Sequence, residues 1–397
     1  MAGPLDGIKV LDITHAYSGT FCTLILRDLG AEVIKVERQE GGDPVRNDAP
    51  RTKGLEGGTF IMLNRGKKSI TLNLKSEKGL DICRELAKRA DVVVQNFAPG
   101  AMDKLGLGSK DLCELNPGLI YASLSAYGQT GPRRNELGYD PMGQAMGGLM
   151  AVTGFPDGPP TRAGVAIADF SSGLYTALAI VSAVFHRTKT GEGQTIDISM
   201  QDCIWLFTAM EYVPHYFLAG KVPPRFGNGN PNLVPANVYP AKDGSVFISA
   251  ISLAQVQTFF RLIGGEELVN SPLCCPQAER LQYKDQIDAM VAEWTKARSV
   301  EEIMDLCREA EVPCTVVPTL EQVCNDPHLY SREMIIEIEQ PISGKITSPG
   351  SVFKLDKTPG NIRFPAPFLG EHNYEVLSSM LGYTESEIKQ LDKDGII

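Results

Sequence analysis

The feature that most constrains the fold is a regular alternation of short apolar runs and helical patterns near the start of this 397-residue chain. The strand-like runs are residues 8–13, 31–36, 69–74, 91–96 and 119–124, of which 69–74 alternates between polar and apolar residues, and the helical patterns between them include 20–29 and 77–90. Parallel strands need helical crossovers of this kind, so the pattern predicts an α/β fold with a Rossmann-like, doubly wound parallel sheet. Because ligands of such sheets bind outside the carboxyl ends of the strands, we look for chemistry in the turns that follow each run.

The alternation is interrupted at residues 221–238, where Pro, Gly and Asn are frequent enough to indicate a loop. Strand-like and helical patterns then resume on a smaller scale, as expected for a second domain of the α+β class. The predicted parts are a large α/β domain over 1–200, a linker helix and loop over 201–225, a small α+β domain over 226–320, and a C-terminal segment over 321–397.

Composition excludes several classes of partner. The formal net charge of −10 argues against general binding to nucleic acid or to an anionic membrane. No run of about 18 apolar residues is present and the N-terminus lacks the layout of a secretory signal, so we expect a cytoplasmic protein. The nine cysteines and five histidines show no metal-binding spacing, so no metal site is predicted.

The common cofactor and hydrolase motifs are missing from the sequence. The first apolar run is followed by THAYSGT, which has one glycine where the dinucleotide-binding fingerprint needs three. The sequence also has no Gly-x-x-x-x-Gly-Lys-Ser/Thr loop and no Gly-x-Ser-x-Gly elbow. These absences argue against NAD-dependent, ATP-dependent and serine-hydrolase functions.

Polar side chains follow the predicted strands at the points where those strands end. His15 follows the first run, Arg38 the second, Lys75 the third and Asn96 the fourth. Since the carboxyl ends of parallel strands share one edge of the sheet, these residues are expected to border a common cleft, although each alone also suits a solvated loop. Together with Lys104, the two cations offer a site for a phosphorylated ligand on an otherwise acidic protein.

Asp169 ends an apolar run directly before a helical pattern, in the stretch GVAIADFSSGLYTAL. One interpretation is a helix N-cap, whose carboxylate accepts a hydrogen bond from an amide of Ser171 or Ser172. The other is a carboxylate nucleophile beside small residues that admit a substrate. The two interpretations are compatible, because helix amides that cap the aspartate would also favour its ionised form.

Eight stretches of the chain carry a family resemblance. They are LDGIKVLDITHAYSG at 5–19, LGAEVIKVER at 29–38, RGKKSITLNLKSEKG at 65–79, DVVVQNFAPGAMDKLGLG at 91–108, NPGLIYASLSAYG at 116–128, TGFPDGPPTRAGVAIADFSSG at 153–173, KTGEGQTIDISMQD at 189–202 and FLGEHNYEVL at 368–377. Together they resemble the class III CoA-transferases, the family of formyl-CoA transferase, carnitine CoA-transferase and the bile-acid-inducible enzymes. The resemblance covers essentially the whole chain.

This resemblance implies a homodimer of interlocked rings, in which residues 321–397 complete the large, CoA-binding domain. It implies an acyl-CoA donor and a carboxylic acid acceptor, with the coenzyme A thioester as substrate and no permanently bound cofactor. Asp169 matches the family's nucleophile, which forms an aspartyl anhydride and then an aspartyl-CoA thioester. The positions that match the family's CoA contacts are Arg38, Leu72, Lys75, Asn96, Phe97, Ala98, Met102 and Lys104, the last of which is an arginine in formyl-CoA transferase.

The substrate pocket implied by the resemblance departs from the better-known members of the family. It comprises His15, Tyr17, Asp48, Thr59 and Tyr139. The formyl-CoA enzymes have Gln, Trp and Tyr in place of Tyr17, Asp48 and Thr59, so an oxalate pocket is not expected. Related acyl-CoA racemases use a histidine where this chain has Tyr139, which favours transfer over racemisation. A racemase on the same fold and a CoA-binding protein without catalytic activity are the alternative functions, and α-proton exchange or the lack of a covalent intermediate would identify them.

Overall fold

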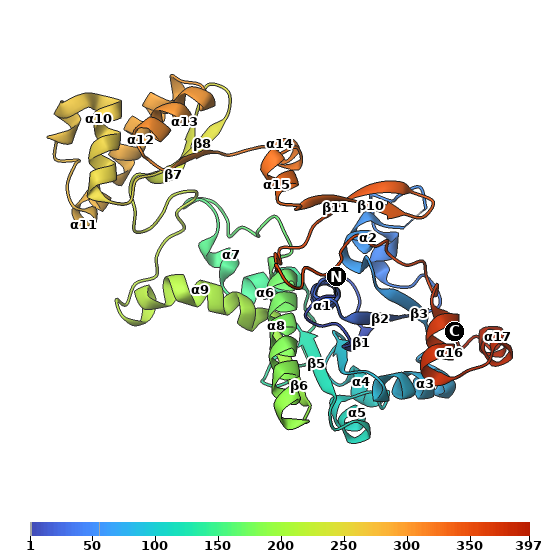
Figure 1. Ribbon diagram of the computed structural model, residues 1–397. Coiled ribbons are helices and arrows are strands. Elements are labelled where there is room, and N and C mark those ends of the chain that lie inside the picture. The colour runs from blue at the N-terminus through green and yellow to red at the C-terminus, as the bar shows by residue number, and fades with distance from the viewer. Residues whose placement is uncertain (1, 55) are drawn as a thin grey trace. The chain divides into compact units, whose positions relative to one another are not determined.

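The computed structural model describes residues 2–54 and 56–397, and its central element is a six-stranded sheet (Figure 1). The strands are β1 (Lys9–Ile13), β2 (Glu32–Glu37), β3 (Lys68–Thr71), β4 (Val92–Gln95), β5 (Ile120–Ser125) and β6 (Gln194–Ser199). Their order across the sheet is β3-β2-β1-β4-β5-β6, and all neighbouring pairs are parallel. The predicted doubly wound parallel sheet is therefore confirmed.

The chain divides into two compact units. The first unit consists of the residues up to Leu149, Arg162–Glu211 and His328–Ile397, and the second consists of Met150–Thr161 and Tyr212–Pro327. The expected small domain, 226–320, lies inside the second unit, which begins 14 residues earlier on its main segment and also takes in the short segment Met150–Thr161.

Helices cover both faces of the parallel sheet, because side chains of each strand alternate between the two faces. The helices of the first unit include α1 (Ser18–Asp28), α2 (Gly58–Asn64), α3 (Glu77–Lys88), α4 (Ala101–Lys104), α5 (Ser109–Leu115), α6 (Asp140–Met146), α8 (Ile167–Thr190), α16 (Asn373–Leu381) and α17 (Glu385–Lys393). On one face Val10 is buried with Leu26 of α1 and Ile180 of α8. On the other face Leu11 is buried with residues of α3, α16 and α17. Burial on both faces explains why β4 is almost entirely apolar, whereas β6, most of whose residues are exposed or half-buried, is largely polar.

Helix α8 is long and apolar enough to cross a membrane by length and composition alone. Half of its apolar stretch is buried inside the protein, and its side chains share a core with α1 and the sheet. This packing is that of a core helix in an α/β domain.

The C-terminal segment closes the β3 edge of the sheet. The backbone amide of Thr71 donates a hydrogen bond of 2.8 Å to the side chain of Asn373, and the amide of Asn73 donates one of 2.8 Å to the carbonyl of Ile396. A hairpin of β10 (Ile335–Gln340) and β11 (Gly344–Pro349) packs against α2, with Ile336 and Ile338 in a common apolar cluster. Residues more than 300 positions apart in the sequence thus share one core.

The second unit has its own sheet and apolar core. Its elements include β7 (Ala236–Pro240), β8 (Ser245–Ser249), β9 (Cys314–Val316), α10 (Leu253–Val269), α11 (Gln277–Arg280), α12 (Lys284–Lys296), α13 (Val300–Glu309) and α14 (Leu320–Cys324). The three strands are antiparallel in the order β7-β8-β9, as expected for an α+β unit. Phe259, Phe260 and Ile287 lie in its centre. The remaining helices, α7 (Leu149–Val152), α9 (Met200–Phe217) and α15 (Pro327–Ser331), lie where the chain passes between the two units.

Candidate active site

A cavity of about 870 Å³ lies at the carboxyl edge of the parallel sheet, within the first unit. Its walls come from the turns after β1, β4 and β5 and from the first turns of α6 and α8. The strand order runs in opposite directions on the two sides of the β1–β4 pair, because β2 and β3 lie beside β1 whereas β5 and β6 lie beside β4. The last residues that β1 and β4 pair are Ile13 and Gln95. This is the topological switch point, at which open α/β sheets leave a crevice for ligands.

Asp169 lines this cavity from the first turn of α8. The predicted N-cap role is wrong, because the helix begins at Ile167 and Ala166 occupies the cap position. The amides at the helix start are instead satisfied from α6: the Ala168 and Asp169 amides donate hydrogen bonds of 2.8 and 3.4 Å to Oδ1 of Asp140. A carboxylate remote in sequence thus caps α8, which leaves the Asp169 side chain free for other interactions.

The carboxylate of Asp169 has no hydrogen-bond or ion-pair partner among residues 2–54 and 56–397. Burial raises the pKa of Asp169 to about 7, and the neighbouring charge of Asp140 contributes to the rise. The expectation that capping amides would favour its ionised form is therefore wrong, since those amides bind Asp140. An unpaired carboxyl group with a pKa near neutrality is the kind of perturbed group that marks reactive sites.

The turn after β1 places His15 and Tyr17 in the cavity wall. The side-chain oxygen of Asn96 accepts from the His15 amide at 3.0 Å, and its NH₂ group donates to the His15 carbonyl at 2.8 Å. The His15 ring meets Phe97 edge-on at 5.0 Å, and Tyr17 meets Phe170 at 6.1 Å between ring centroids. Burial lowers the pKa of His15, with opposing contributions from the surrounding charges, and so favours the neutral imidazole.

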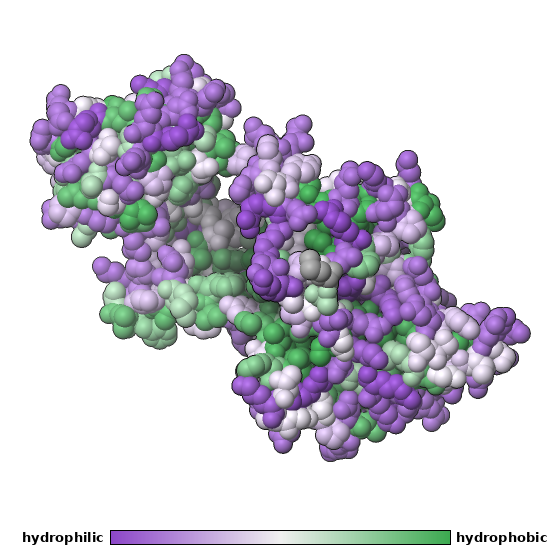
Figure 2. Space-filling model, viewed as in Figure 1, coloured by the Kyte–Doolittle hydropathy of each residue, from purple (hydrophilic) through white to green (hydrophobic). Residues whose placement is uncertain are grey.

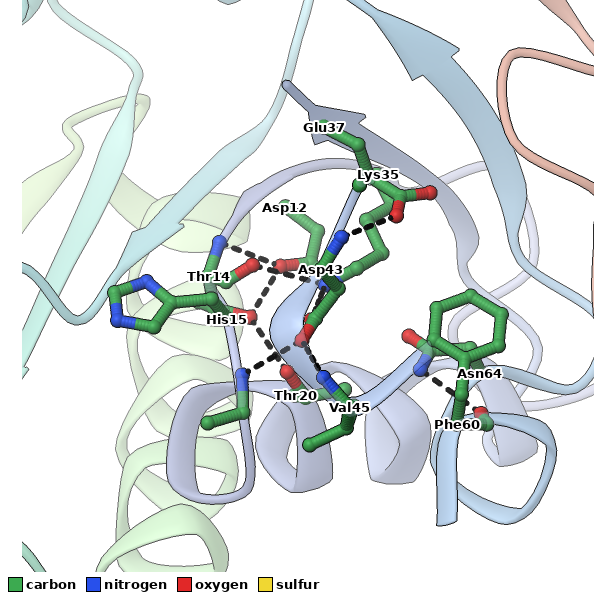
Figure 3. Close-up of polar contacts among 12 residues, drawn as sticks. Asp12, Thr14, His15, Thr20, Lys35, Glu37, Asp43, Val45, Phe60 and Asn64 are labelled. Carbon is green, nitrogen blue, oxygen red and sulfur yellow. Dashed lines mark hydrogen bonds and ion pairs between the residues drawn. The ribbon is translucent and has the colours of Figure 1, made fainter. Parts of the chain in front are cut away.

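A network of buried charges lies beneath this turn (Figure 3). Lys35 pairs with Asp43 at 2.9 Å and Lys67 pairs with Asp12 at 3.1 Å, and all four side chains are fully buried. In Figure 3 the imidazole of His15 points away from the carboxylates of Asp12 and Asp43. The network therefore holds the backbone of the turn and leaves the His15 ring to the cavity.

The eight positions expected to contact CoA fall into three groups. Asn96, Phe97 and Ala98 line the cavity. Arg38, Lys75 and Lys104 are exposed outside its lining, and the described residues provide no ion-pair partner for any of them. The side chains of Leu72 and Met102 are buried in the core beside the sheet.

The expected substrate-pocket residues are divided between two cavities. His15, Tyr17, Asp48 and Tyr139 line the cavity that contains Asp169. Thr59 lines a second, mainly apolar cavity of about 580 Å³, and Tyr17 and Phe170 border both. The aromatic pair therefore separates Thr59 from the cavity that contains Asp169.

Four residues near the cavity were not among the predicted site residues. Arg134, Arg162 and Asp140 line it, and Asp43 supports its wall from below. For Asp140 a signal exists, because an aspartate followed by proline is typical of a helix start, as α6 shows. For Arg134 and Arg162 no signal distinguishes a cavity residue from a solvated loop residue.

Comparisons with known proteins identify the family of this chain. Residues 5–373 match the model of CoA-transferase family III. The chain is 36% identical over 99% of its length to a succinyl-CoA–D-citramalate CoA-transferase of Chloroflexus aurantiacus, covering 98% of that protein. It is 34% identical over 99% of its length to a human succinyl-CoA:glutarate CoA-transferase, covering 90% of it. A crystal structure of a CaiB/BaiF family protein from Brucella suis superposes with a TM-score of 0.86 at 34% identity, over 96% of this chain and 100% of that one. The chain belongs to CoA-transferase family III, the class to which its sequence motifs pointed.

Proposed function

We propose that this enzyme moves coenzyme A from an acyl-CoA to a free carboxylic acid, with Asp169 as the covalent nucleophile. The observation that carries the proposal is the unpaired carboxyl group of Asp169, which lies in a cavity of about 870 Å³ at the switch point of the sheet. A structural carboxylate in such a position would be expected to have a partner. A pKa of about 7 leaves a large ionised fraction at neutral pH and makes that fraction more nucleophilic than an ordinary carboxylate.

The proposed sequence has four steps. The Asp169 carboxylate attacks the acyl-CoA carbonyl, which forms an aspartyl anhydride and releases CoA thiolate. The thiolate attacks the aspartyl carbonyl, which forms an aspartyl-CoA thioester and releases the donor acid. The acceptor carboxylate attacks that thioester, which forms a second anhydride and again releases thiolate. Attack of the thiolate on the acceptor's carbonyl then yields the new acyl-CoA and regenerates Asp169, so every bond formed is matched by one broken. Holding the reactants in attack geometry supplies a large part of the rate.

The CoA moiety is proposed to extend from this cavity toward the exposed cations Arg38, Lys75 and Lys104. Two features support this placement. The three cations follow strand β2, follow strand β3 and lie in α4 after β4, and they have no ion-pair partner among the described residues. The Phe97–Ala98 segment, which lines the cavity, precedes α4. Phosphate groups are natural ligands for cations left unpaired on a protein of net charge −10.

The substrates are proposed to be dicarboxylic acids and their mono-CoA esters. The relatives named above act, by their names, on succinyl-CoA together with citramalate or glutarate, which are all dicarboxylates or their esters. In this chain Arg134 and Arg162 line the cavity, and the described residues provide no ion-pair partner for either. A second carboxylate, remote from the reacting one, would supply that partner.

Covalent trapping tests the central proposal. The protein is incubated with succinyl-CoA, then treated with hydroxylamine or borohydride, and its peptides are analysed by mass spectrometry. The expected result is modification of the peptide that contains Asp169, and no modification when free CoA replaces the ester. Modification of another residue, or transfer without any trapped species, would overturn the assignment.

The substrate class is tested with a panel of carboxylate acceptors. Arg162→Gln is expected to raise KM for a dicarboxylate about tenfold, and to leave KM for a monocarboxylate of equal length unchanged, because one charge-assisted contact is lost. Arg332→Gln is the matched control, because Arg332 is exposed, lies outside this cavity and has no ion-pair partner among the described residues. Equal effects on both acceptor classes would argue against a dicarboxylate pocket.

A homodimer is proposed on the basis of an exposed apolar surface on α8 and α9. Leu178 and Phe185 of α8 are 58% and 62% exposed, and Phe207 and Met210 of α9 are 46% and 73% exposed. Figure 2 shows hydrophobic residues gathered over α9 and part of α8. Large apolar side chains that are exposed together in this way are typical of a protein–protein interface. Sedimentation should give one species near twice 43.1 kDa across dilution, and a stable monomer would contradict the proposal.

A further inference from the structure

The turn that carries His15 and Tyr17 contains a strained residue. Ala16, which lies between them, has a φ of 60°, in the left-handed region that a non-glycine residue rarely adopts. This conformation is less favourable than a right-handed one, because it brings Cβ close to the following carbonyl oxygen. The surrounding structure must therefore hold Ala16 in place, and strained residues that are held in this way cluster at functional sites.

The group that holds Ala16 is the carboxylate of Asp43. Its Oδ1 accepts hydrogen bonds of 3.1 Å from the Ala16 amide and of 3.1 Å from the Val45 amide. Its Oδ2 pairs at 2.9 Å with the ammonium of Lys35, which also donates to the Thr14 carbonyl at 2.8 Å. Figure 3 shows the Asp43 carboxylate between Lys35 and the backbone of Val45.

One carboxylate oxygen thereby joins two walls of the cavity. Ala16 belongs to the turn after β1, and Val45 belongs to the short 3₁₀ helix Pro44–Asn47 that follows β2, and both residues line the cavity. Since Lys35 and Asp43 are fully buried, water cannot replace either partner. Hydrogen bonds to an ionised acceptor in such surroundings are strong enough to offset the strain at Ala16.

We propose that Asp43, oriented by Lys35, is a positioning residue that keeps Ala16 in its left-handed conformation and so directs His15 and Tyr17 into the cavity beside Asp169. Asn96 fixes the His15 backbone from the β4 side, and Asp43 fixes the next residue from the β2 side. The inference rests on the proposed function, because its consequence is measured as a rate of CoA transfer. It concerns the shape of the cavity wall and adds no group that touches the substrate.

The experiment removes the hydrogen bonds without leaving a buried charge. Asp43→Ala combined with Lys35→Met removes both charges and the acceptor of the Ala16 amide. Asp43→Asn combined with Lys35→Met removes the same charges but keeps an oxygen at the Oδ1 position. Adding Ala16→Gly to the first variant removes the strain, because glycine adopts positive φ without cost. Asp91→Asn combined with Arg187→Met removes another ion pair of the first unit, which lines neither of the two cavities, and serves as the control for lost stability.

The proposal predicts a graded result in kcat. The variant that combines Asp43→Ala with Lys35→Met should lose about 100-fold in kcat, because small displacements of an active-site wall have effects of this size. Its KM for the acyl-CoA should change little. Asp43→Asn in place of Asp43→Ala, with Lys35→Met retained, should recover most of the loss. Adding Ala16→Gly to the Asp43→Ala and Lys35→Met variant should recover part of it. The control variant should have the kcat of the unaltered protein.

Two outcomes would overturn the proposal. One is a folded variant with Asp43→Ala and Lys35→Met whose kcat equals that of the unaltered protein. The other is a control variant whose kcat falls by as much as that of the Asp43→Ala and Lys35→Met variant. Failure of the unaltered protein to transfer CoA from any acyl-CoA would instead count against the proposed function. These results are distinguishable because each variant is compared with the unaltered protein in the same assay.

Discussion

Two aspartates of the first unit, the fully buried Asp12 and the half-buried Asp169, show contrasting electrostatics. Asp12, beneath the turn after β1, is fully buried, and burial alone would raise its pKa. The ammonium groups of Lys67 and Lys35, together with hydrogen bonds from Thr14 and Thr23, lower that pKa to about 2. Asp169, at the start of α8, has no such partner, and burial with the charge of Asp140 raises its pKa to about 7.

The comparison shows that burial does not decide whether a carboxylate is structural or reactive. The partners decide it: Asp12 has two cations and two hydroxyl groups, and its charge is committed to holding the turn. Asp169 keeps an uncommitted carboxyl group, which the protein can hold only at a cost in stability. Such a cost is expected where the group serves a reaction.

The largest expected effect is the loss of transfer in Asp169→Asn. This change keeps the shape of the side chain and removes the charge of the proposed nucleophile, so kcat should fall by at least about 10⁴-fold, as removal of a covalent nucleophile does in other enzymes. Initial rates of CoA transfer measure the effect, and CoA binding should be retained. Peptide mass spectrometry must exclude deamidation back to aspartate, after which near-normal turnover would make the assignment wrong.

Asp12→Asn, unlike Asp169→Asn, should mainly lower the stability of the protein. It leaves the buried ammonium of Lys67 without its counter-charge, a situation that costs about 3–5 kcal/mol in the free energy of unfolding. Because the pKa of Asp12 is lowered on folding, its stabilising contribution is present above about pH 4 and is lost as the pH falls toward 2. The difference between variant and unaltered protein should shrink over that range.

Urea unfolding at several pH values measures this difference. Adding Lys67→Met to Asp12→Asn should recover most of the lost stability, because no buried charge then remains unpaired. A single Asp12→Asn variant as stable as the unaltered protein at pH 7 would show that the ion pair contributes nothing.

The sequence predicted the parallel sheet well, because the neighbouring strands β1 and β4 are buried and lie in mainly apolar runs. The cap of α3 was also predictable: Ser76 accepts a hydrogen bond of 3.0 Å from the Gly79 amide, and both residues lie within one turn. Short helices such as α4 and α6 were not predicted, since four to seven residues do not establish a helical period. Pattern reasoning therefore captures long elements and local caps.

The candidate site was predictable in part. The chain pattern placed Asp169 at a helix start and His15 after a strand, and both line the cavity. The cap of α8 by Asp140 could not be predicted, because that hydrogen bond joins residues 28 positions apart. The contact between Asp43 and Ala16 spans 27 positions and was missed for the same reason. Contacts between separate elements depend on the tertiary fold, which local sequence pattern does not encode.

The smallest expected effect is a shift in the pH dependence of Asp140→Asn. Since the negative charge of Asp140 contributes to the raised pKa of Asp169, its removal should lower that pKa, while the oxygen of asparagine still caps the Ala168 amide. The proposed nucleophile is the ionised form of Asp169, so kcat/KM of the unaltered protein should rise with pH through about 7. In the variant the midpoint should move down by about one unit at most, because the effect of burial remains.

The difference between the two pH profiles isolates the contribution of Asp140. Phosphate groups of CoA and the His15 imidazole titrate in both proteins, so their contributions cancel in the comparison. Asp140 also accepts a hydrogen bond of 2.7 Å from Gln144, and Gln144→Met removes this bond while it leaves the charge in place. That control should keep the midpoint of the unaltered protein and lose only stability. An unmoved midpoint in Asp140→Asn, with the Gln144→Met profile also unchanged, would mean that burial alone raises the pKa of Asp169.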